Sequence, residues 1–262
     1  MLDEPVEVDD VENAKELKDI SGDVTFENVT FSYDGKINIL ENFNLHVKSG
    51  ESIALVGPTG AGKTTVVNLL SRFYNINEGR LLLDDYDISQ VTLHSLRTHV
   101  GIMLQDSFIF SGTIMDNIRY GRLDATDEEV IEAAKTGCAH EFIMEMEKGY
   151  YTEVNERGSR LSQGQKQLIA LARTLLSNPS ILILDEATSS IDAKTERQLQ
   201  AGIQALLKGR TSFIIAHRLS TIKNCDKILY IANKGIAEIG SHEELLAKKG
   251  AYWHLYTSQL EE

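Results

Sequence analysis

The sequence predicts an α/β fold: a mixed, mainly parallel sheet surrounded by helices, with an N-terminal antiparallel β subdomain and an inserted α-helical subdomain. Residues 52–56, 181–184 and 212–216 are short and almost continuously apolar, which is typical of strands buried on both faces. Apolar residues at helical spacing follow the first two runs, so strand and helix alternate along the chain. Residues 24–31 and 43–47 instead alternate imperfectly between apolar and polar side chains, as half-buried antiparallel strands do.

The composition is that of an ordinary globular protein. The chain has 262 residues, enough for one large or two small domains, and its net charge of −13 argues against a nucleic-acid-binding surface. The two cysteines, Cys138 and Cys225, lack metal-site spacing and favour a reducing compartment. No apolar run reaches membrane-spanning length, and Met1 is followed by acidic residues rather than by a signal peptide. Any role at a membrane therefore needs a partner that crosses it.

Residues 1–20 are predicted to be a linker. They carry eight acidic residues and two lysines, with Pro5 and weak hydrophobic periodicity. A short helix over Val11–Leu17 is one interpretation, but the composition favours a solvated tail.

A glycine-rich stretch between the first buried strand and the first helix carries the strongest chemical signal. It fits the pattern G-x-x-x-x-G-K-[ST] and consists of Gly57, Pro58, Thr59, Gly60, Ala61, Gly62, Lys63 and Thr64. Glycines let backbone N–H groups turn inward around phosphate oxygens, and the following helix N-terminus adds positive potential. Lys63 would reach the β- and γ-phosphates, and Thr64 would place its hydroxyl on Mg²⁺. The alternative is a glycine turn with a solvated lysine, which the rest of the chain disfavours.

Polar residues stand at the carboxyl ends of several predicted strands. Asp185 and Glu186 follow the apolar run 181–184, at the sheet edge where ligands bind in open α/β folds. Asp185 is placed to hold a Mg²⁺ shell, and Glu186 to orient or deprotonate an attacking water. Gln105 and His217 also end predicted strands. Each is either a polar residue at the strand exit or a functional residue: Gln105 as a Mg²⁺ ligand and His217 as a catalytic histidine.

The remaining strands follow from turn signals. Asp34-Gly35 separates the first two strands, and the runs at 80–83 and 100–104 predict two more. Residues 227–232 and 236–239 predict a hairpin. Tyr33, beside the first turn, is by local pattern a half-exposed strand aromatic; its functional alternative is a ring stacked on a nucleotide base.

Several helices are predicted from capping boxes, in which a Ser or Thr and an acid or Gln three residues later bond to each other's backbone N–H. Such boxes begin helices at Thr126, Ser162 and Ser241. Residues 140–147 and the tail from 252 to 260 are also expected to be helical, the tail packed on the surface. Ser162, followed by Gly164, is locally an ordinary cap and alternatively an anion site.

In this order, the motifs resemble those of the nucleotide-binding domain of ATP-binding cassette (ABC) transporters, over residues 21–262. Residues 57–64 are similar to its Walker A motif and 181–186 to its Walker B strand with the catalytic acid. Residues 161–165 are similar to its signature LSGGQ, and 189–192 to its D-loop.

This resemblance implies a P-loop NTPase core over 21–105 and 171–262, with the helical subdomain over about 106–170. It also makes residues 1–20 the end of a connection from a transmembrane domain. The implied ATP-binding residues are Tyr33, Gly57, Pro58, Thr59, Gly60, Ala61, Gly62, Lys63, Thr64, Thr65, Gln105 and Asp185. The implied catalytic residues are Lys63, Gln105, Glu186 and His217, with Mg²⁺ held by Thr64, Gln105 and, through water, Asp185.

The family mechanism further implies a head-to-tail dimer with a second nucleotide-binding domain, as a homodimer or a heterodimer. The residues implied to contact ATP of the other subunit are Ser162, Gln163, Gly164, Gln165 and Asp192. Hydrolysis would reopen the dimer and move a transmembrane domain at the cytoplasmic face of the membrane.

Within the family, residues 105–118 and 152–158 resemble stretches typical of exporters. Two positions depart from the family pattern. Gln163 stands where the signature has Gly, and Asn155 where the exporter loop usually has Gly. Ser162, Gly164 and Gln165 are retained, so we expect little loss of phosphate contact.

The sequence disfavours three alternative functions relative to export. A chromosome-maintenance or repair ATPase would have a long coiled coil between phosphate loop and signature, whereas Thr64 and Ser162 lie 98 positions apart without sustained heptads. A regulatory nucleotide-binding module without turnover is disfavoured by the intact Asp185, Glu186 and His217. An importer ATPase made as a free subunit is disfavoured by the exporter-like stretch.

Overall fold

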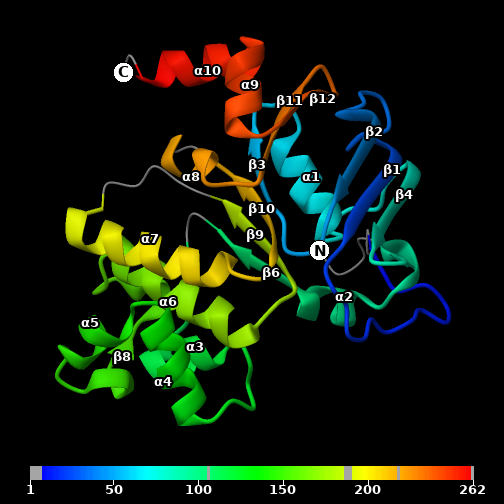
Figure 1. The fold of residues 1–262 in the computed structure, drawn as a ribbon. Coiled ribbons are helices and arrows are strands. Elements are labelled where there is room, and N and C mark those ends of the chain that lie inside the picture. Colours follow the sequence, from blue (N-terminus) through cyan, green and yellow to red (C-terminus); the bar gives the residue numbers. More distant parts are fainter. Residues whose placement is uncertain (1–7, 105–106, 186–190, 217–218, 261–262) are drawn as a thin grey trace.

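A computed structural model describes residues 8–104, 107–185, 191–216 and 219–260, and its centre is a six-stranded sheet (Figure 1). The strand order is β12-β11-β3-β10-β9-β6, and every neighbouring pair is parallel except β11 with β12. The predicted α/β fold with a mixed, mainly parallel sheet is therefore confirmed. The strands are β3 (Ser52–Val56), β6 (Val100–Met103), β9 (Ile181–Asp185), β10 (Thr211–Ile215), β11 (Lys227–Ala232) and β12 (Gly235–Gly240).

The central strands are buried on both faces because their side chains alternate between two cores. Ile53 and Leu55 of β3 pack into the core that contains α1 (Lys63–Leu70). Ala54 and Val56 of the same strand pack into the opposite core, which helices from the later part of the chain cover. This period of two explains why the sequence shows a continuous apolar run there.

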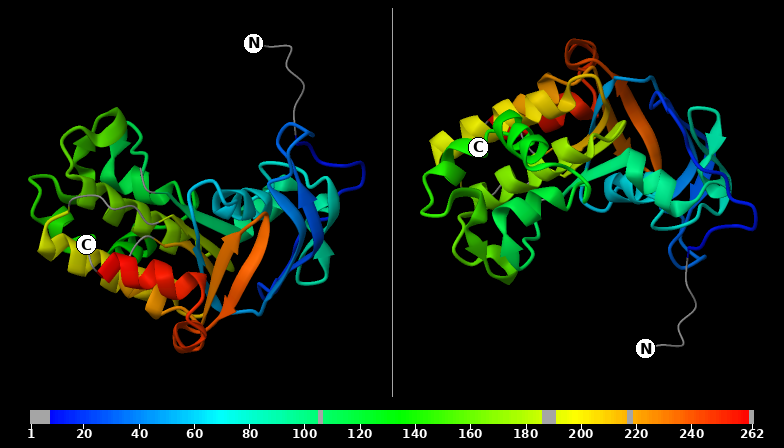
Figure 2. Two further views of the ribbon diagram at one scale, coloured as in Figure 1. Left: turned by 90° about the horizontal axis from the view of Figure 1, so that it is seen from above. Right: turned by 90° about the horizontal axis from the view of Figure 1, so that it is seen from below.

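A second, antiparallel sheet packs on the α1 side, in the order β2-β1-β4-β5. Its strands are β1 (Val24–Phe31), β2 (Leu40–Val47), β4 (Glu78–Leu83) and β5 (Tyr86–Asp87). The predicted strand pairing across the Asp34-Gly35 turn is confirmed, since β1 and β2 are antiparallel neighbours. In both views of Figure 2 this blue and cyan sheet lies at one end of the molecule.

A cluster of helices lies at the other end, with its own apolar core (Figure 2). Its elements are α3 (Ile114–Arg119), α4 (Asp127–Thr136), α5 (His140–Met144), α6 (Gln163–Ser177), and the short strands β7 (Gly112–Thr113) and β8 (Glu153–Val154). The helix α6 is continuous through residue 170, the expected boundary. Its Leu168 packs into the helical core, and its Leu171 into the core of the main sheet. The same helix therefore packs against both the helical cluster and the main sheet.

Further helices complete the structure: α2 (Leu93–His99), α7 (Ala193–Leu207), α8 (Leu219–Lys223), α9 (His242–Lys248) and α10 (Ala251–Leu260), with short 3₁₀ turns at Ile88–Gln90, Gly149–Tyr151 and Glu156–Gly158. The tail helix α10 is more than surface-packed, because Tyr252 is fully buried and its hydroxyl lies 2.8 Å from His242 Nδ1. None of the described helices is long and apolar enough to cross a membrane.

Residues 8–20 are neither a helix nor a solvated tail. Leu17 and Ile20 are buried in the first core, and Lys15 forms a bridge with Val91. The buried Arg72 guanidinium donates to Asp9 O at 3.0 Å and to Val91 O at 2.7 Å. The acidic composition favoured a solvated segment. Instead, the β-bridge and the hydrogen bonds of Arg72 attach residues 8–20 to parts of the domain that are distant in sequence.

Candidate functional site

The glycine loop after β3 has the backbone geometry that its sequence predicts. Gly57, Gly60 and Gly62 all have positive φ, at 139°, 79° and 106°. A Cβ on Gly57 would lie 2.2 Å from the carbonyl oxygen of Ile231 in β11. Only glycine fits at this position, because the conformation is strained for other residues and the neighbouring strand leaves no space.

The loop leads directly into α1, whose N-cap is the left-handed Gly62. The first N–H groups of a helix lack partners within it, and the helix dipole makes this end positive. Backbone donors therefore converge at the loop with favourable potential for an anion.

The ammonium of Lys63 lies over the loop. Its Nζ donates to Gly57 O at 2.7 Å and to Pro58 O at 2.9 Å. Burial lowers the pKa of Lys63 below its ordinary value. A partly desolvated cation that donates to two carbonyl oxygens is well placed to bind phosphate oxygens, since an anionic partner would compensate its lost hydration.

The two threonines that begin α1 face different surroundings. Thr64 is exposed, whereas Thr65 is buried and its Oγ1 lies 3.1 Å from the hydroxyl of Tyr33. Tyr33 itself is 49% exposed. The fold thus brings Tyr33 beside the glycine loop, as the base-stacking hypothesis requires.

The carboxyl ends of β3, β6, β9 and β10 meet at one edge of the parallel sheet. Asp185 is the last residue of β9 and pairs in register with Ile215 of β10, which in turn neighbours β3. Asp185 therefore lies two strands away from the glycine loop, at the same edge. The proposed site residues Gln105, Glu186 and His217 follow β6, β9 and β10 but lie outside the described residues.

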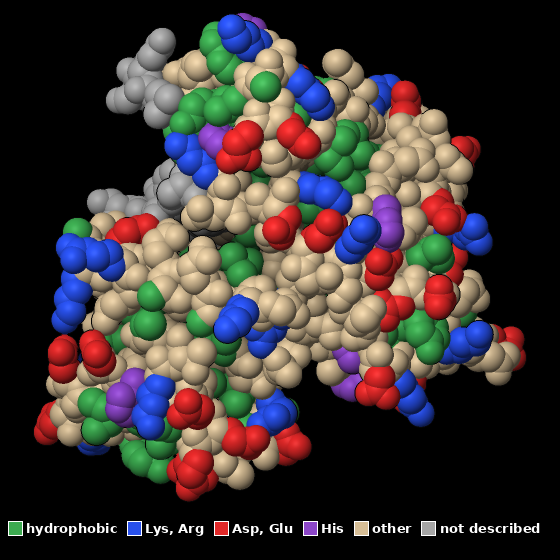
Figure 3. Space-filling view, in the orientation of Figure 1, with side chains coloured by type: hydrophobic (Ala, Val, Ile, Leu, Met, Phe, Trp, Pro, Cys, Tyr) green, Lys and Arg blue, Asp and Glu red, His purple; other side chains and the backbone are tan. Residues whose placement is uncertain are grey.

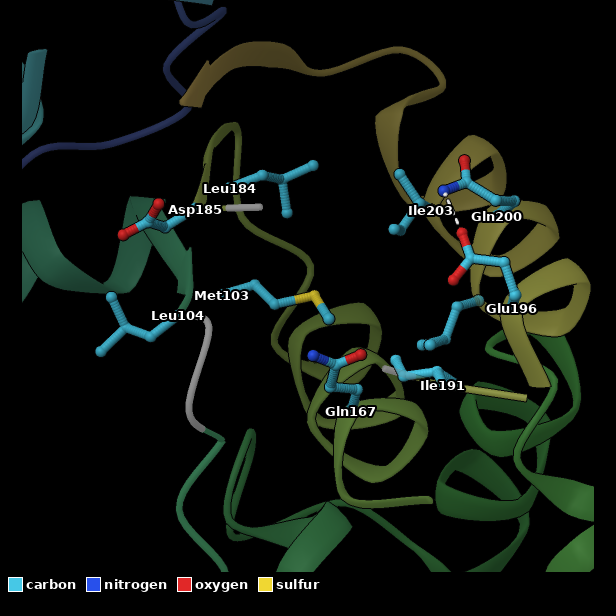
Figure 4. A pocket seen from close by; sticks show the side chains of 10 residues that line it. Met103, Leu104, Gln167, Leu184, Asp185, Ile191, Glu196, Gln200 and Ile203 are labelled. Atoms are coloured by element: carbon cyan, nitrogen blue, oxygen red, sulfur yellow. Dashed lines mark hydrogen bonds between the residues drawn. The ribbon is translucent and has the colours of Figure 1, made fainter. Parts of the chain in front are cut away.

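A small pocket opens beside this edge, between the ends of β6 and β9 and the helices α6 and α7. Figure 4 shows Met103 and Leu184 between Asp185 on one side and α7 on the other. On α7, Gln200 Nε2 donates to Glu196 Oε1 at 3.2 Å. The pocket is continuous with the sheet edge that carries Asp185.

The start of α6 forms a second polar feature, in the helical end of the molecule. The predicted capping box is present: Ser162 Oγ accepts from Gln165 N at 3.2 Å, and Gln165 Oε1 accepts from Ser162 N at 3.0 Å. Ser162 is exposed, while Leu161 before it is buried in the helical core. The exposed helix N-terminus is therefore anchored and presented to solvent, as an anion-binding helix end must be.

The beginnings of α6 and α7 are packed against each other. A Cβ on Gly164 would lie 2.3 Å from Thr195 Cγ2, so this contact requires glycine. Asp192 caps α7 through Oδ1, which accepts from the N–H groups of Lys194 and Thr195. Hydrogen bonds from the Thr195 side chain and N–H lower the pKa of Asp192. The exposed Ser162 and Asp192 therefore stand at the starts of two helices that pack against each other.

Charge is not concentrated on the face shown in Figure 3, where acidic and basic side chains are interspersed.

The glycine loop after a buried parallel strand, the lysine over it and the acid ending a nearby strand define a nucleotide-binding domain of the P-loop class.

Comparison with known proteins identifies the family. A family profile described as ABC transporter matches residues 40–189. Among curated proteins, the chain is 52% identical over 261 residues to an uncharacterized ABC transporter ATP-binding protein, YfiC, of Bacillus subtilis. It is 51% identical over 251 residues to a putative multidrug export ATP-binding/permease protein, YgaD, of the same organism. The alignments cover 100% and 95% of this chain but 43% of either relative.

A solved structure agrees with these relatives. A bacterial Atm1-family ABC exporter with ATP bound superposes with a TM-score of 0.91 at 46% identity, covering 98% of this chain and 45% of that one. The chain belongs to the ABC transporter family and is similar to the ATP-binding domains of its exporters, a class of ATP hydrolases. It spans less than half the length of these relatives.

Sequence reasoning did not select two residues that surround Tyr33. The ring of Tyr74 lies 4.9 Å from that of Tyr33, and Asn77 Oδ1 accepts from the N–H of Ser32 at 2.7 Å. No local pattern marks either residue, because both contacts join positions more than 40 residues apart.

Proposed function

We propose that this chain binds and hydrolyses ATP and so powers export of a substrate through a transmembrane partner. The observation that carries the proposal is the glycine loop itself. The loop contains three glycines with positive φ, and the Lys63 ammonium lies above it. The Tyr33 hydroxyl is hydrogen-bonded to Thr65 in α1, the helix that follows the loop.

Each part of the loop then has a distinct task. Backbone N–H groups of the glycine loop and of the first turn of α1 bind the phosphates, and the Lys63 ammonium stabilises charge on the β- and γ-phosphates. The ring of Tyr33 stacks on the base. Such stacking contributes roughly 1–3 kcal/mol per base and reads no hydrogen-bonding pattern, so base selectivity is expected to be weak.

The residues around the loop also fit Mg²⁺, which prefers hard oxygen ligands. The exposed Thr64 hydroxyl and the amide oxygen of Gln105 would bind it directly, and the Asp185 carboxylate through water. When bound, Mg²⁺ neutralises charge on the phosphate oxygens. Asp185 ends β9 at the same sheet edge as the loop, which is compatible with this role.

Hydrolysis needs a positioned water and charge stabilisation in the transition state. We assign Glu186 to orient and deprotonate the water, and His217 to hydrogen-bond the transferring phosphoryl group. Both residues follow strands that end at the ligand edge of the sheet.

The second half of each site comes from another nucleotide-binding domain. Ser162, Gln163, Gly164, Gln165 and Asp192 of that domain would meet the γ-phosphate of ATP bound to the glycine loop. The capped, exposed N-terminus of α6 supports this role. Closing a head-to-tail dimer, of two copies or of two related chains, excludes water and completes the site.

The helical cluster would pass this motion to a transmembrane domain, with the nucleotide-binding domains at the cytoplasmic face. Residues 1–20 would connect the two. The exporter relatives, of which this chain spans less than half, support the presence of such a domain.

Steady-state ATP hydrolysis by Glu186→Gln tests the proposal. We expect turnover to fall about 100-fold or more, because the water loses its base. The control Glu132→Gln removes an exposed carboxylate 3.9 Å from Lys135 on α4 and should hydrolyse ATP like the parent. Equal turnover by parent and Glu186→Gln would refute the catalytic assignment. Tight ATP binding by a parent without turnover would instead identify a regulatory module.

A further inference from the structure

We propose that Tyr74 is a positioning residue for the nucleotide base, acting through Tyr33. The inference rests on the proposed base-stacking role of Tyr33 and adds a second aromatic residue to it. Tyr74 lies in the turn after α1 and not in the glycine loop.

Three aromatic rings form one cluster at the end of β1. The Tyr33 ring lies 4.8 Å from Phe31 and 4.9 Å from Tyr74, with interplanar angles of 85° and 86°. Tyr74 also lies 5.9 Å from Phe31, so each ring touches the other two. Phe31 is buried and Tyr74 is half-buried against the same core, which makes both fixed supports for the exposed Tyr33.

The backbone that carries Tyr33 is held on both sides. Asn77 accepts from Ser32 N through Oδ1, and its own N–H donates to Thr30 O at 3.1 Å. After Tyr33, the Asp34 carboxylate accepts from the N–H groups of Lys36 and Ile37. The turn containing Tyr74 and Asn77 therefore fixes the approach of the chain to Tyr33.

The hydroxyl of Tyr33 is fixed as well, at 3.1 Å from Thr65 Oγ1. A ring held at its hydroxyl by α1 and at its side by Tyr74 has few conformations left before a ligand arrives. Stacking then costs little additional ordering, whereas a freely rotating ring must lose side-chain entropy first. Loss of the Tyr74 ring should therefore weaken binding of the base without touching the phosphate contacts.

Calorimetric titration with ADP measures this effect without turnover. We expect Tyr74→Leu and Tyr74→Met to raise the Kd for ADP about two- to tenfold, the range of an aromatic pair. Tyr74→Phe keeps the ring and should bind like the parent. The Kd for inorganic tripolyphosphate, which has no base, should be unchanged in all three variants.

Phe73→Leu is the matched control, since it removes a ring from the same turn. Phe73 is exposed and lies under the Arg97 guanidinium at 5.5 Å, so it should leave the Kd for ADP unchanged. Tyr33→Ala tests the underlying function and should raise that Kd about five- to hundredfold. Adding Tyr74→Leu to Tyr33→Ala should then have no further effect.

The outcomes separate the two claims. If Tyr33→Ala binds ADP like the parent, base stacking on Tyr33 fails and the inference falls with it. If Tyr33→Ala weakens binding and both Tyr74→Leu and Tyr74→Met do not, only the positioning role is overturned. A matching loss of tripolyphosphate affinity in the Tyr74 variants, or additive effects in the double variant, would also overturn it.

Discussion

Gly57 sets the shape of the phosphate-binding loop more tightly than any other single residue described. It is the point where β3 ends and the chain turns beneath β11, with φ at 139° and no space for a Cβ beside Ile231 O. The other loop glycines are less constrained by packing: a Cβ on Gly60 would meet open space, and one on Gly62 would lie 3.1 Å from Leu40 Cδ2. The requirement for glycine at 57 is thus both conformational and steric.

Gly57→Ala is expected to lower the free energy of unfolding by about 3 kcal/mol and to abolish ATP binding, because β11 or the loop must move. Gly209→Ala is the matched control: φ is 75°, but nothing lies within 4 Å of the added Cβ. Its cost should be about 1 kcal/mol, with ATP binding retained. Urea unfolding measures the stability of both variants, and nucleotide titration measures their ATP binding. Equal losses in the two variants would contradict the steric argument.

Individual residues were predictable from sequence where chemistry is local. The glycine loop needs glycines, a lysine and a threonine in one stretch, so its residues could be named in advance. The neighbourhood of Tyr33 could not, because Tyr74 and Asn77 reach it through the folding of β4 against β1. The buried Arg72 was unforeseen for the same reason, since its partners include Asp9 and Val91.

Among the elements, α6 connects structure and proposed function most directly. Its N-terminus carries Ser162 and Gly164. Its remaining length packs into the helical core and into the core of the main sheet on the face opposite to α1. The capping box gives it a defined first turn. The same box begins α9 at Ser241, with Glu244 as the reciprocal partner and no role in the proposed site.

These two helices allow a matched test of structural and functional capping. Ser162→Ala and Ser241→Ala should each lower the free energy of unfolding by about 1 kcal/mol, the usual cost of losing an N-cap. Only Ser162→Ala should also lower ATP turnover, by about 100-fold, since it removes a donor from the developing charge. If Ser241→Ala lowers turnover equally, the role of Ser162 is purely structural.

Strong local signals identified the elements correctly, and tertiary contacts account for those missed. Apolar runs gave β3, β9 and β10, and capping boxes gave α4, α6 and α9. The helix α2 was not predicted, and residues 8–20 were assigned to solvent. The two segments stabilise each other: Leu93 N donates to Asp10 Oδ1, and Leu17 N to Ser95 Oγ. Such contacts have no local pattern.

At the scale of the whole molecule, the residues proposed to contact ATP lie in two separate regions. The glycine loop and Tyr33 lie with the antiparallel sheet and the first core, while Ser162 and Asp192 lie with the helical cluster. The helix α6 packs into the helical core and into the core on the main-sheet face opposite to α1. This division supports the proposal that a second nucleotide-binding domain completes each ATP site.

Size-exclusion chromatography of Glu186→Gln measures whether such a dimer forms. The variant should elute as a monomer without nucleotide and as a dimer with ATP and Mg²⁺, because blocked hydrolysis traps the closed state. With ATP and EDTA it should remain a monomer, since Mg²⁺ is part of the proposed site. A monomer in all three conditions would contradict the claim that two copies of this chain complete the sites.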